Sequence, residues 1–238
     1  MEVLHPVQRK NSMEKIKDQS GSCDILPRIG ILWDVGSGFP SSGDRKLVQI
    51  VDARLAEAQR RSGDWLACRK GCTPCCIGVF RINQLDRARL EHGLRELAVR
   101  DPARAEAIRK RAHLWVARLG HGFPGDPATG LLGTSKKERR RFRDFANQEP
   151  CPALDPAEGT CDLYEFRPMT CRTFGPPVRV EGGGLGVCEL CYQGRSEEEI
   201  AACEMIPDPD DLESCLLEEV EESTGKCGDT IVAFALAA

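Results

Sequence analysis

Apolar residues recur every three or four positions along several stretches of the chain, the pattern of amphipathic α-helices. In the first of these stretches Leu47, Val51, Leu55 and Ala58 share one face. The same pattern predicts helices over residues 44–61, 83–101, 102–119, 135–147, 196–205 and 212–223. The chain is therefore predicted to be mainly helical.

Polar residues mark where these helices begin. Asp44 and Asn83 are candidate N-caps, and Asp101 is followed by Pro102, a favourable first helical residue. The stretches 135–138 and 196–199 both read as capping boxes, in which a serine and a glutamate three residues later satisfy each other's backbone amides. The helix starts are thus better defined than the helix ends.

Between the helices, the remaining segments are short and irregular. Residues 77–82 form an extended run, and residues 155–159 form a loop between two short extended pieces. The segment 178–187 alternates around three consecutive glycines and predicts a small β-hairpin. The predicted fold is mainly α with irregular loops and a small β-hairpin, its helices packed around a loop-borne cysteine metal centre.

Residues 1–43 lack either periodicity and are rich in glycine, serine and isolated charges. We expect them to be a disordered leader that can be removed without loss of the fold. Residues 44–238 are expected to form a single cysteine-cluster domain. Its apolar C-terminal tail, residues 230–236, is predicted to dock on the core.

The cysteines add candidate chemistry to the predicted fold. Of the 13 in the chain, nine fall in two stretches about eighty residues apart: Cys68, Cys72, Cys75, Cys76, Cys151, Cys161, Cys171, Cys188 and Cys191. Thiolates clustered at such short spacings are typical ligands of zinc, iron and iron–sulfur clusters. All four histidines lie outside these segments. The candidate cofactor is therefore Zn²⁺ or iron, including a [4Fe-4S] cluster, bound by sulfur after the chain folds back to bring the stretches together.

The number of sites stays open. Nine candidates exceed by one the eight that two complete four-cysteine sites require, so either one is spare or one metal keeps an open position. Adjacent side chains of an extended backbone point to opposite sides, so Cys75 and Cys76 can serve different sites. Cys203, Cys215 and Cys227 stand at isolated spacing and are expected to be small apolar fillers.

Two arginines, Arg167 and Arg172, flank Cys171. A four-thiolate site carries net negative charge, so a nearby guanidinium would stabilise it through charge-assisted hydrogen bonds. The alternative is that both are surface arginines without a special partner.

The composition limits which classes of partner and which cellular compartment are expected. The net charge is −4, and neither a signal peptide nor a membrane span is recognisable, so we expect a cytoplasmic protein that binds a metal ion and no membrane. The basic run over residues 136–143 lacks a series of stacking aromatics. It is predicted to be a solvated helix face, with nucleic acid an unlikely partner.

The order of the motifs resembles a known family. Cys68-x3-Cys72-x2-Cys75-Cys76, followed by Cys151-Pro-x-Leu, by Cys161-x-Leu-Tyr-Glu-x-Arg-Pro-x-x-Cys171-Arg and by Cys188, is similar to the bacterial YkgJ-type cysteine-cluster family of zinc- or iron-chelating domains. The resemblance covers residues 47–195 and implies metal chelation, with the cellular role undefined.

An enzymatic alternative stays open. Flagellin lysine N-methylases have a similar cluster, and Cys68-x3-Cys72-x2-Cys75 has the spacing of a radical-SAM motif, which would imply an iron–sulfur-dependent, SAM-using activity. Against it, Pro74 stands where an aromatic residue is usual, and alternating strands and helices do not follow. We assign no catalytic residue.

Overall fold

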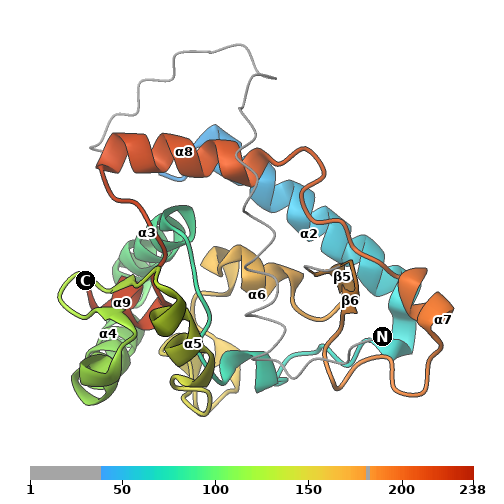
Figure 1. Ribbon diagram of the computed structural model, residues 1–238, viewed down its shortest axis with the longest axis horizontal. Helices are drawn as coiled ribbons and strands as arrows, with labels where there is room; N and C mark the ends of the chain where they lie inside the picture. The colour runs from blue at the N-terminus through green and yellow to red at the C-terminus, as the bar shows by residue number, and fades with distance from the viewer. Residues whose placement is uncertain (1–38, 181–182) are drawn as a thin grey trace.

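The computed structural model describes residues 39–180 and 183–238 and is built mainly from helices, which are labelled here as in Figure 1. The helices are α2 Ser42–Ser62, α3 Gln84–Arg100, α4 Pro102–Leu119, α5 Lys136–Asp144, α6 Met169–Thr173, α7 Glu197–Ala201, α8 Leu212–Thr224 and α9 Val232–Ala237. The strands form antiparallel two-stranded hairpins: β1 Gly125–Asp126 with β2 Leu131–Leu132, β3 Leu154–Asp155 with β4 Thr160–Cys161, and β5 Val178–Arg179 with β6 Leu185–Gly186. The predicted fold class is confirmed.

The helix starts follow the predicted caps, with one exception. Asn83 accepts a hydrogen bond from the amide of Asp86 at 2.9 Å, Asp101 caps α4 in the same way, and both predicted capping boxes are formed. The exception is α2, which begins at Ser42 and uses Ser41 as its N-cap instead of Asp44. Asp44 lies in the first turn of α2, where its buried side chain accepts hydrogen bonds from Arg89.

Two helices end earlier than predicted. Helix α5 stops at Asp144, because Phe145 takes an extended conformation and Ala146 a positive φ of 52°. Helix α7 stops at Ala201, and beyond it the amide of Met205 donates to the carbonyl of Pro177 at 2.8 Å. After α7 the amides of Cys203 and Glu204 bond three residues back, and Met205 takes a tertiary partner where the periodic pattern predicts a helical one.

The first part of the core lies between α3, α4 and α9. Buried leucines of α3 meet Ile108 and Ala112 of α4, and α9 packs against both helices. The segment before α9 is fixed by a reciprocal backbone pair, in which Ile82 and Thr230 exchange hydrogen bonds of 2.9 Å. The C-terminal tail thus docks on the core as predicted, and it does so as a helix.

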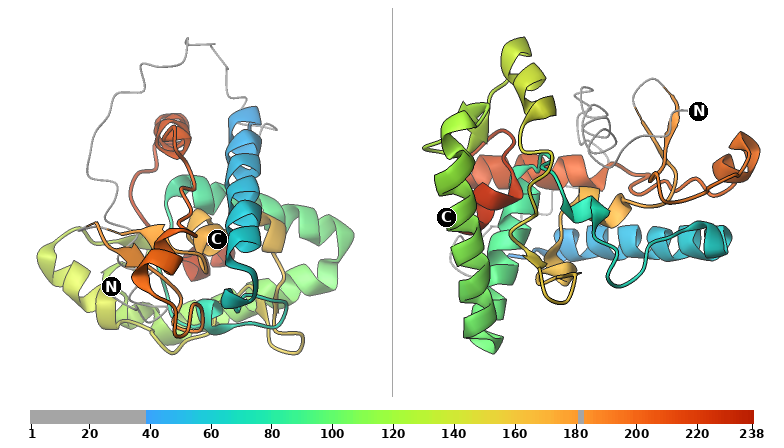
Figure 2. Two further views of the ribbon diagram at one scale, coloured as in Figure 1. Left: turned by 90° about the vertical axis from the view of Figure 1, so that its right-hand side faces the viewer. Right: turned by 90° about the horizontal axis from the view of Figure 1, so that it is seen from below.

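The second part of the core lies between α2 and α8, with Leu85, Met169 and Val178 contributed from other segments. Figure 1 shows α8 along the same edge of the molecule as α2, and Figure 2 gives the two perpendicular views. Phe39 packs against this cluster. The rest of the predicted leader, residues 1–38, lies outside the described residues, and the proposed domain boundary stays a prediction.

Gly93 on α3 faces the side chain of Phe166, and this contact supports a prediction. Alanine in place of glycine usually stabilises a helix by about 1 kcal/mol. At this position the added Cβ would lie 2.3 Å from Cγ of Phe166. We expect Gly93→Ala to destabilise the protein by about 1–3 kcal/mol because of overpacking. Urea denaturation measures the change. In a Phe166→Gly background, which removes the ring and also the Cβ that would lie 2.6 Å away, the same substitution should become neutral or stabilising.

Candidate metal centre

The first cysteine stretch is a chain of turns between α2 and α3. After the short 3₁₀ turn Gly63–Trp65 the chain runs irregularly to a second one, Pro74–Cys76. The amide of Cys72 donates to the carbonyl of Arg69 at 3.0 Å, and that of Cys76 to the carbonyl of Thr73 at 2.7 Å. Local turns therefore fix the backbone that carries Cys72, Cys75 and Cys76. Cys75 and Cys76 are not extended as expected, but in a 3₁₀ turn neighbouring side chains still diverge by about 120°.

The second stretch places its cysteines on three different supports. Cys151 follows the loop after α5, Cys161 ends strand β4, and Cys171 lies in the single turn of α6. Cys188 and Cys191 follow the β5–β6 hairpin in a tight turn, where the amide of Cys191 donates to the carbonyl of Cys188 at 2.9 Å. These supports bring the two stretches together in two places.

At one of these two places, the end of the second cysteine stretch lies against the start of the first cysteine stretch. The amide of Ala67 donates to Sγ of Cys191 at 3.3 Å, and the amide of Tyr192 donates to the carbonyl of Trp65 at 2.7 Å. The thiols of Cys68 and Cys188 both hydrogen-bond with that of Cys191. We call the cysteines at this place the Cys68 set. Its members are Cys68, Cys72, Cys75, Cys188 and Cys191.

In the second place the hairpins around Cys151 meet the end of the first stretch. The amide of Cys151 donates to the carbonyl of Cys76 at 2.8 Å, and Ile77 pairs with Pro150. Cys151, Cys161 and Cys171 are half-buried and pack against the core of α3, α4 and α9. We call Cys76, Cys151, Cys161 and Cys171 the Cys151 set.

Three thiols, one in the Cys151 set and two in the Cys68 set, have raised pKa values. Burial and the neighbouring Cys151 raise the pKa of Cys161 to about 12. For Cys191 the hydrogen bond with Cys188 lowers the pKa, but that with Cys68 and burial outweigh it and raise the pKa to about 11. Burial, with Cys75 and Cys188 nearby, also raises the pKa of Cys72. Without a metal these side chains hold their protons, so a metal would have to displace them.

Charged residues brace the Cys151 set from outside. Asp162, directly after Cys161, has a side chain that is 1 % exposed and accepts hydrogen bonds from Arg104 and Arg111 of α4. Arg111 also donates to the carbonyl of Pro152 at 2.7 Å. Helix α4 therefore holds both the Cys151 loop and the β3–β4 hairpin. The sequence analysis missed this brace, because a charged residue beside a cysteine carries no signal of its distant partners.

The two arginines beside Cys171 differ in their surroundings. Arg172 is 1 % exposed and is held by Asp52 of α2 at 2.7 and 2.8 Å and by the carbonyl of Arg167. It is therefore no surface arginine: it anchors α6 to α2. Arg167 stacks on the ring of Tyr164 at 3.8 Å, and its charge favours the thiolate of Cys161.

Gly175 supports the Cys68 set in a way the sequence did not signal. Its φ is 126°, and a Cβ at this position would lie 2.7 Å from Sγ of Cys68. Only glycine fits both the backbone conformation and the sulfur. The turn after α6 thus approaches Cys68 closely.

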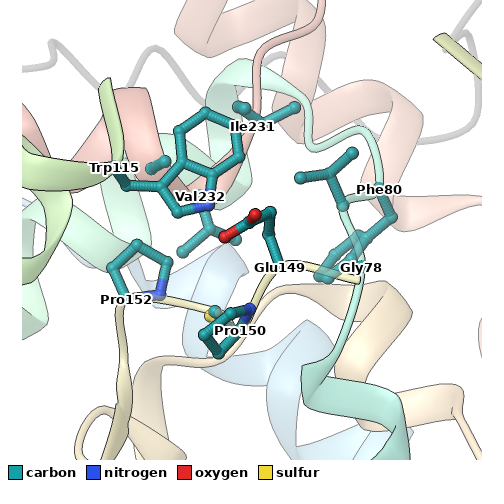
Figure 3. Close-up of a pocket in the computed structure, with 11 residues that line it drawn as sticks. Gly78, Phe80, Trp115, Glu149, Pro150, Pro152, Ile231 and Val232 are labelled. Carbon is teal, nitrogen blue, oxygen red and sulfur yellow. The ribbon is translucent and has the colours of Figure 1, made fainter. Parts of the chain in front are cut away.

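A groove of about 660 Å³ opens beside Cys151, between α4 and residues 150–156, with Leu114 and Arg118 on its α4 side. It borders a small pocket of about 20 Å³ that lies between α4, the start of α9 and the same proline-rich segment (Figure 3). Trp115, Pro150 and Pro152 line both hollows. Cys151 is therefore reached from the surface through the groove.

The isolated cysteines do not share one environment. Cys203 is buried against Cys188 and Cys191, as expected of an apolar filler. Cys227 is exposed and Cys215 is disulfide-bonded, so the filler interpretation is wrong for these two.

The thiols of each set lie near one another, but they do not converge on a common point. Within residues 39–180 and 183–238, no group of three or more Cys, His, Asp or Glu side chains is arranged so that it could hold a metal ion as it stands. The donor chemistry nevertheless fits, since each set consists only of sulfur, the preferred ligand of zinc and iron–sulfur clusters. No helix in the same residues has the length and apolar character that a membrane crossing requires.

Loop-borne thiols held between helices define a cysteine-cluster protein. Residues 67–204, more than half of the chain, match the CxxCxxCC family, described as a "Putative zinc- or iron-chelating domain". The chain belongs to this family, as its motif order predicted. Its first stretch has one more residue than the family name, three between Cys68 and Cys72 instead of two. Searches of the curated proteins and of the solved structures gave no significant match.

Proposed function

We propose that this protein binds zinc or iron, the latter as an iron–sulfur cluster, through thiolates of Cys68, Cys72, Cys75, Cys76, Cys151, Cys161, Cys171, Cys188 and Cys191. The observation that carries the proposal is the contact of Cys68 with Cys191, whose thiols come from opposite stretches and yet hydrogen-bond. The metal supplies a cross-link between loops that are separated in sequence. The family's description points to the same metals.

The chain's own residues prepare for this binding. Ala67 directs an amide at the sulfur of Cys191 and so favours its thiolate. Arg167 does the same for Cys161 through its charge. Asp162, Arg104 and Arg111 fix the loops that carry Cys151 and Cys161. Each of these groups lowers the cost of assembling thiolates before the metal arrives.

The arrangement supports chelation over the radical-SAM alternative. That chemistry needs three thiolates and an open iron position for the cofactor. Cys68, Cys72 and Cys75 have the spacing, but Cys188 and Cys191 lie among them in the same set. Two further thiols at this position favour full coordination by the protein.

Anaerobic purification under reducing conditions tests the proposal. We expect elemental analysis to find zinc or iron in the protein, with a thiolate-to-iron absorption band in the visible spectrum if iron is present. A soluble, folded protein with neither metal above background would contradict the proposal. The Cys227→Ser variant is the matched control, because Cys227 is exposed and belongs to neither set.

A further inference from the structure

The two cysteine sets pack against different parts of the core. Cys188 and Cys191 are buried with Phe174, Val187 and Ile200, and Cys75 packs against the same cluster. Cys151, Cys161 and Cys171 pack instead against the core formed by α3, α4 and α9. The partners that surround each set are therefore distinct, although both sets draw on the first stretch.

Neighbouring residues Cys75 and Cys76 are where the sets divide. Both lie in the 3₁₀ turn Pro74–Cys76, in which successive side chains diverge. Cys75 turns toward the cluster of Cys188 and Cys191, whereas the backbone of Cys76 is hydrogen-bonded to Cys151. The turn itself is held by the pairing of Ile77 with Pro150. One tight turn thus packs Cys75 on the side of Cys188 and Cys191 and bonds the backbone of Cys76 to Cys151.

The size of the sets matters as well. Zinc sites of structural type take four thiolates. The Cys151 set has four members, whereas the Cys68 set has five, and its extra member differs from the rest in exposure. Cys68 is exposed, while Cys188 and Cys191 are 5 % and 3 % exposed. The backbone of Gly175 lies close to Sγ of Cys68, and the thiol of Cys68 hydrogen-bonds with that of Cys191.

From this arrangement we infer that the protein contains two separate metal centres that divide the cysteine pair Cys75 and Cys76 between them. One is a four-thiolate centre of Cys76, Cys151, Cys161 and Cys171, which would assemble when the metal binds. The other takes Cys72, Cys75, Cys188 and Cys191, with exposed Cys68 as a fifth, exchangeable thiol. The inference rests on the proposed function, and it adds the number of centres and the ligands of each.

An exchangeable fifth thiol gives the second centre a route for metal transfer. Cys68 would give up its proton on replacing one of the four thiolates, and the released thiolate would take up that proton, so the exchange needs no electron transfer. A thiolate of an accepting protein can enter by the same substitution. Among residues 39–180 and 183–238 we assign no fifth thiol to the Cys151 set, so its metal is expected to exchange slowly.

Zinc titration of the metal-free protein, followed by native mass spectrometry, tests the inference. We expect about two zinc ions per chain in the unaltered protein and about one in both Cys161→Ser and the double variant Cys68→Ser/Cys191→Ser, in which the fifth thiol can no longer replace the lost ligand. Cys203→Ser is the matched control, because Cys203 is buried beside Cys191, and it should keep both ions. Cys68→Ser should also keep both, but it should lose one of them to a chelator more slowly than the unaltered protein does.

The outcomes separate the two claims. A chain that binds no zinc or iron contradicts the proposed function itself. A chain that binds only one zinc ion, or folded Cys161→Ser and Cys68→Ser/Cys191→Ser variants that both lose all metal, overturns the two-centre inference and leaves metal binding intact. Equal chelator rates for Cys68→Ser and the unaltered protein overturn the exchange role of Cys68.

Alkylation of the unaltered protein provides a test that does not depend on the folding of variants. After partial removal of zinc, N-ethylmaleimide should label cysteines in groups. We expect Cys72, Cys75, Cys188 and Cys191 to become reactive together, and the Cys151 set to become reactive separately and later. Cys227 is exposed, so its labelling serves as the reference for a thiol that the reagent reaches freely. Simultaneous labelling of both sets would show a single shared centre.

Discussion

Replacing Arg89 by alanine is expected to lower the free energy of unfolding by about 3–5 kcal/mol, because it strips two buried carboxylates of their counter-charge. Arg89 is 2 % exposed, and its partners Asp44 and Asp86 are 1 % and 3 % exposed. Its guanidinium donates to Asp44 at 3.1 Å through Nε and to Asp86 at 2.5 Å through Nη1. Burial opposes the charge, but both carboxylates outweigh it and raise the pKa of Arg89.

This network also reaches the candidate metal centre. Asp44 lies on α2 and Asp86 on α3, and Asp86 accepts a further hydrogen bond of 3.0 Å from the amide of Met169, the first residue of α6. Because α6 carries Cys171, the same triad that joins the two parts of the core orients a predicted ligand. We therefore expect Arg89→Ala to weaken metal retention as well as stability.

Urea denaturation in buffers of equal zinc concentration measures the effect. Arg87→Ala is the matched control, since Arg87 lies on the same helix and pairs with Glu91 four residues away near the surface. Its loss should be about 0.3–0.5 kcal/mol. An Arg89→Ala protein as stable as the Arg87→Ala protein would show that the two carboxylates are protonated or hydrated when the arginine is absent.

Metal removal is expected to have the second large effect. With free metal at about a thousand times the dissociation constant, binding stabilises the native state by about 4 kcal/mol, and a chelator removes this contribution. The loops should loosen first, because strands of two residues are too short to be stable alone. The helices should persist, since α3, α4 and α9 pack against one another through aliphatic side chains.

Circular dichroism and limited proteolysis distinguish these parts. After chelation we expect most of the far-ultraviolet helix signal to remain, a lower thermal midpoint, and new cleavage within residues 63–76 and 150–195. Added zinc should reverse all three changes. Loss of the whole helix signal would mean that the metal holds the entire fold together, and unchanged cleavage would mean that the loops are rigid without it.

Local chemistry allowed the sequence to predict most helices and their starts. Asn83, Asp101 and the two capping boxes act within three residues of themselves, so their effect can be recognised without knowing the fold. The cysteine spacings indicated metal chelation for the same reason, since a thiolate's preference for metals does not depend on the fold. The predicted helices agree with the structure, and the predicted metal chelation agrees with the description of the family.

Only the tertiary structure determines which partner a side chain bonds to when the candidate partners are distant in sequence. Asp44 has the chemistry of an N-cap, but the approach of α3 gives it Arg89 as a buried partner and leaves the cap to Ser41. Past the end of helix α7 at Ala201, the amide of Met205 bonds to the carbonyl of Pro177, a partner that the local sequence does not indicate.

The same holds for the cysteines. Cys75 and Cys76 are equivalent in the sequence, and only the packing of the loops sets Cys75 beside Cys188 and Cys191 and joins Cys76 to Cys151. Spacing along the chain determines which residues can bind a metal. The division of those residues into sets depends on contacts between segments about eighty or more residues apart, which local preferences do not encode.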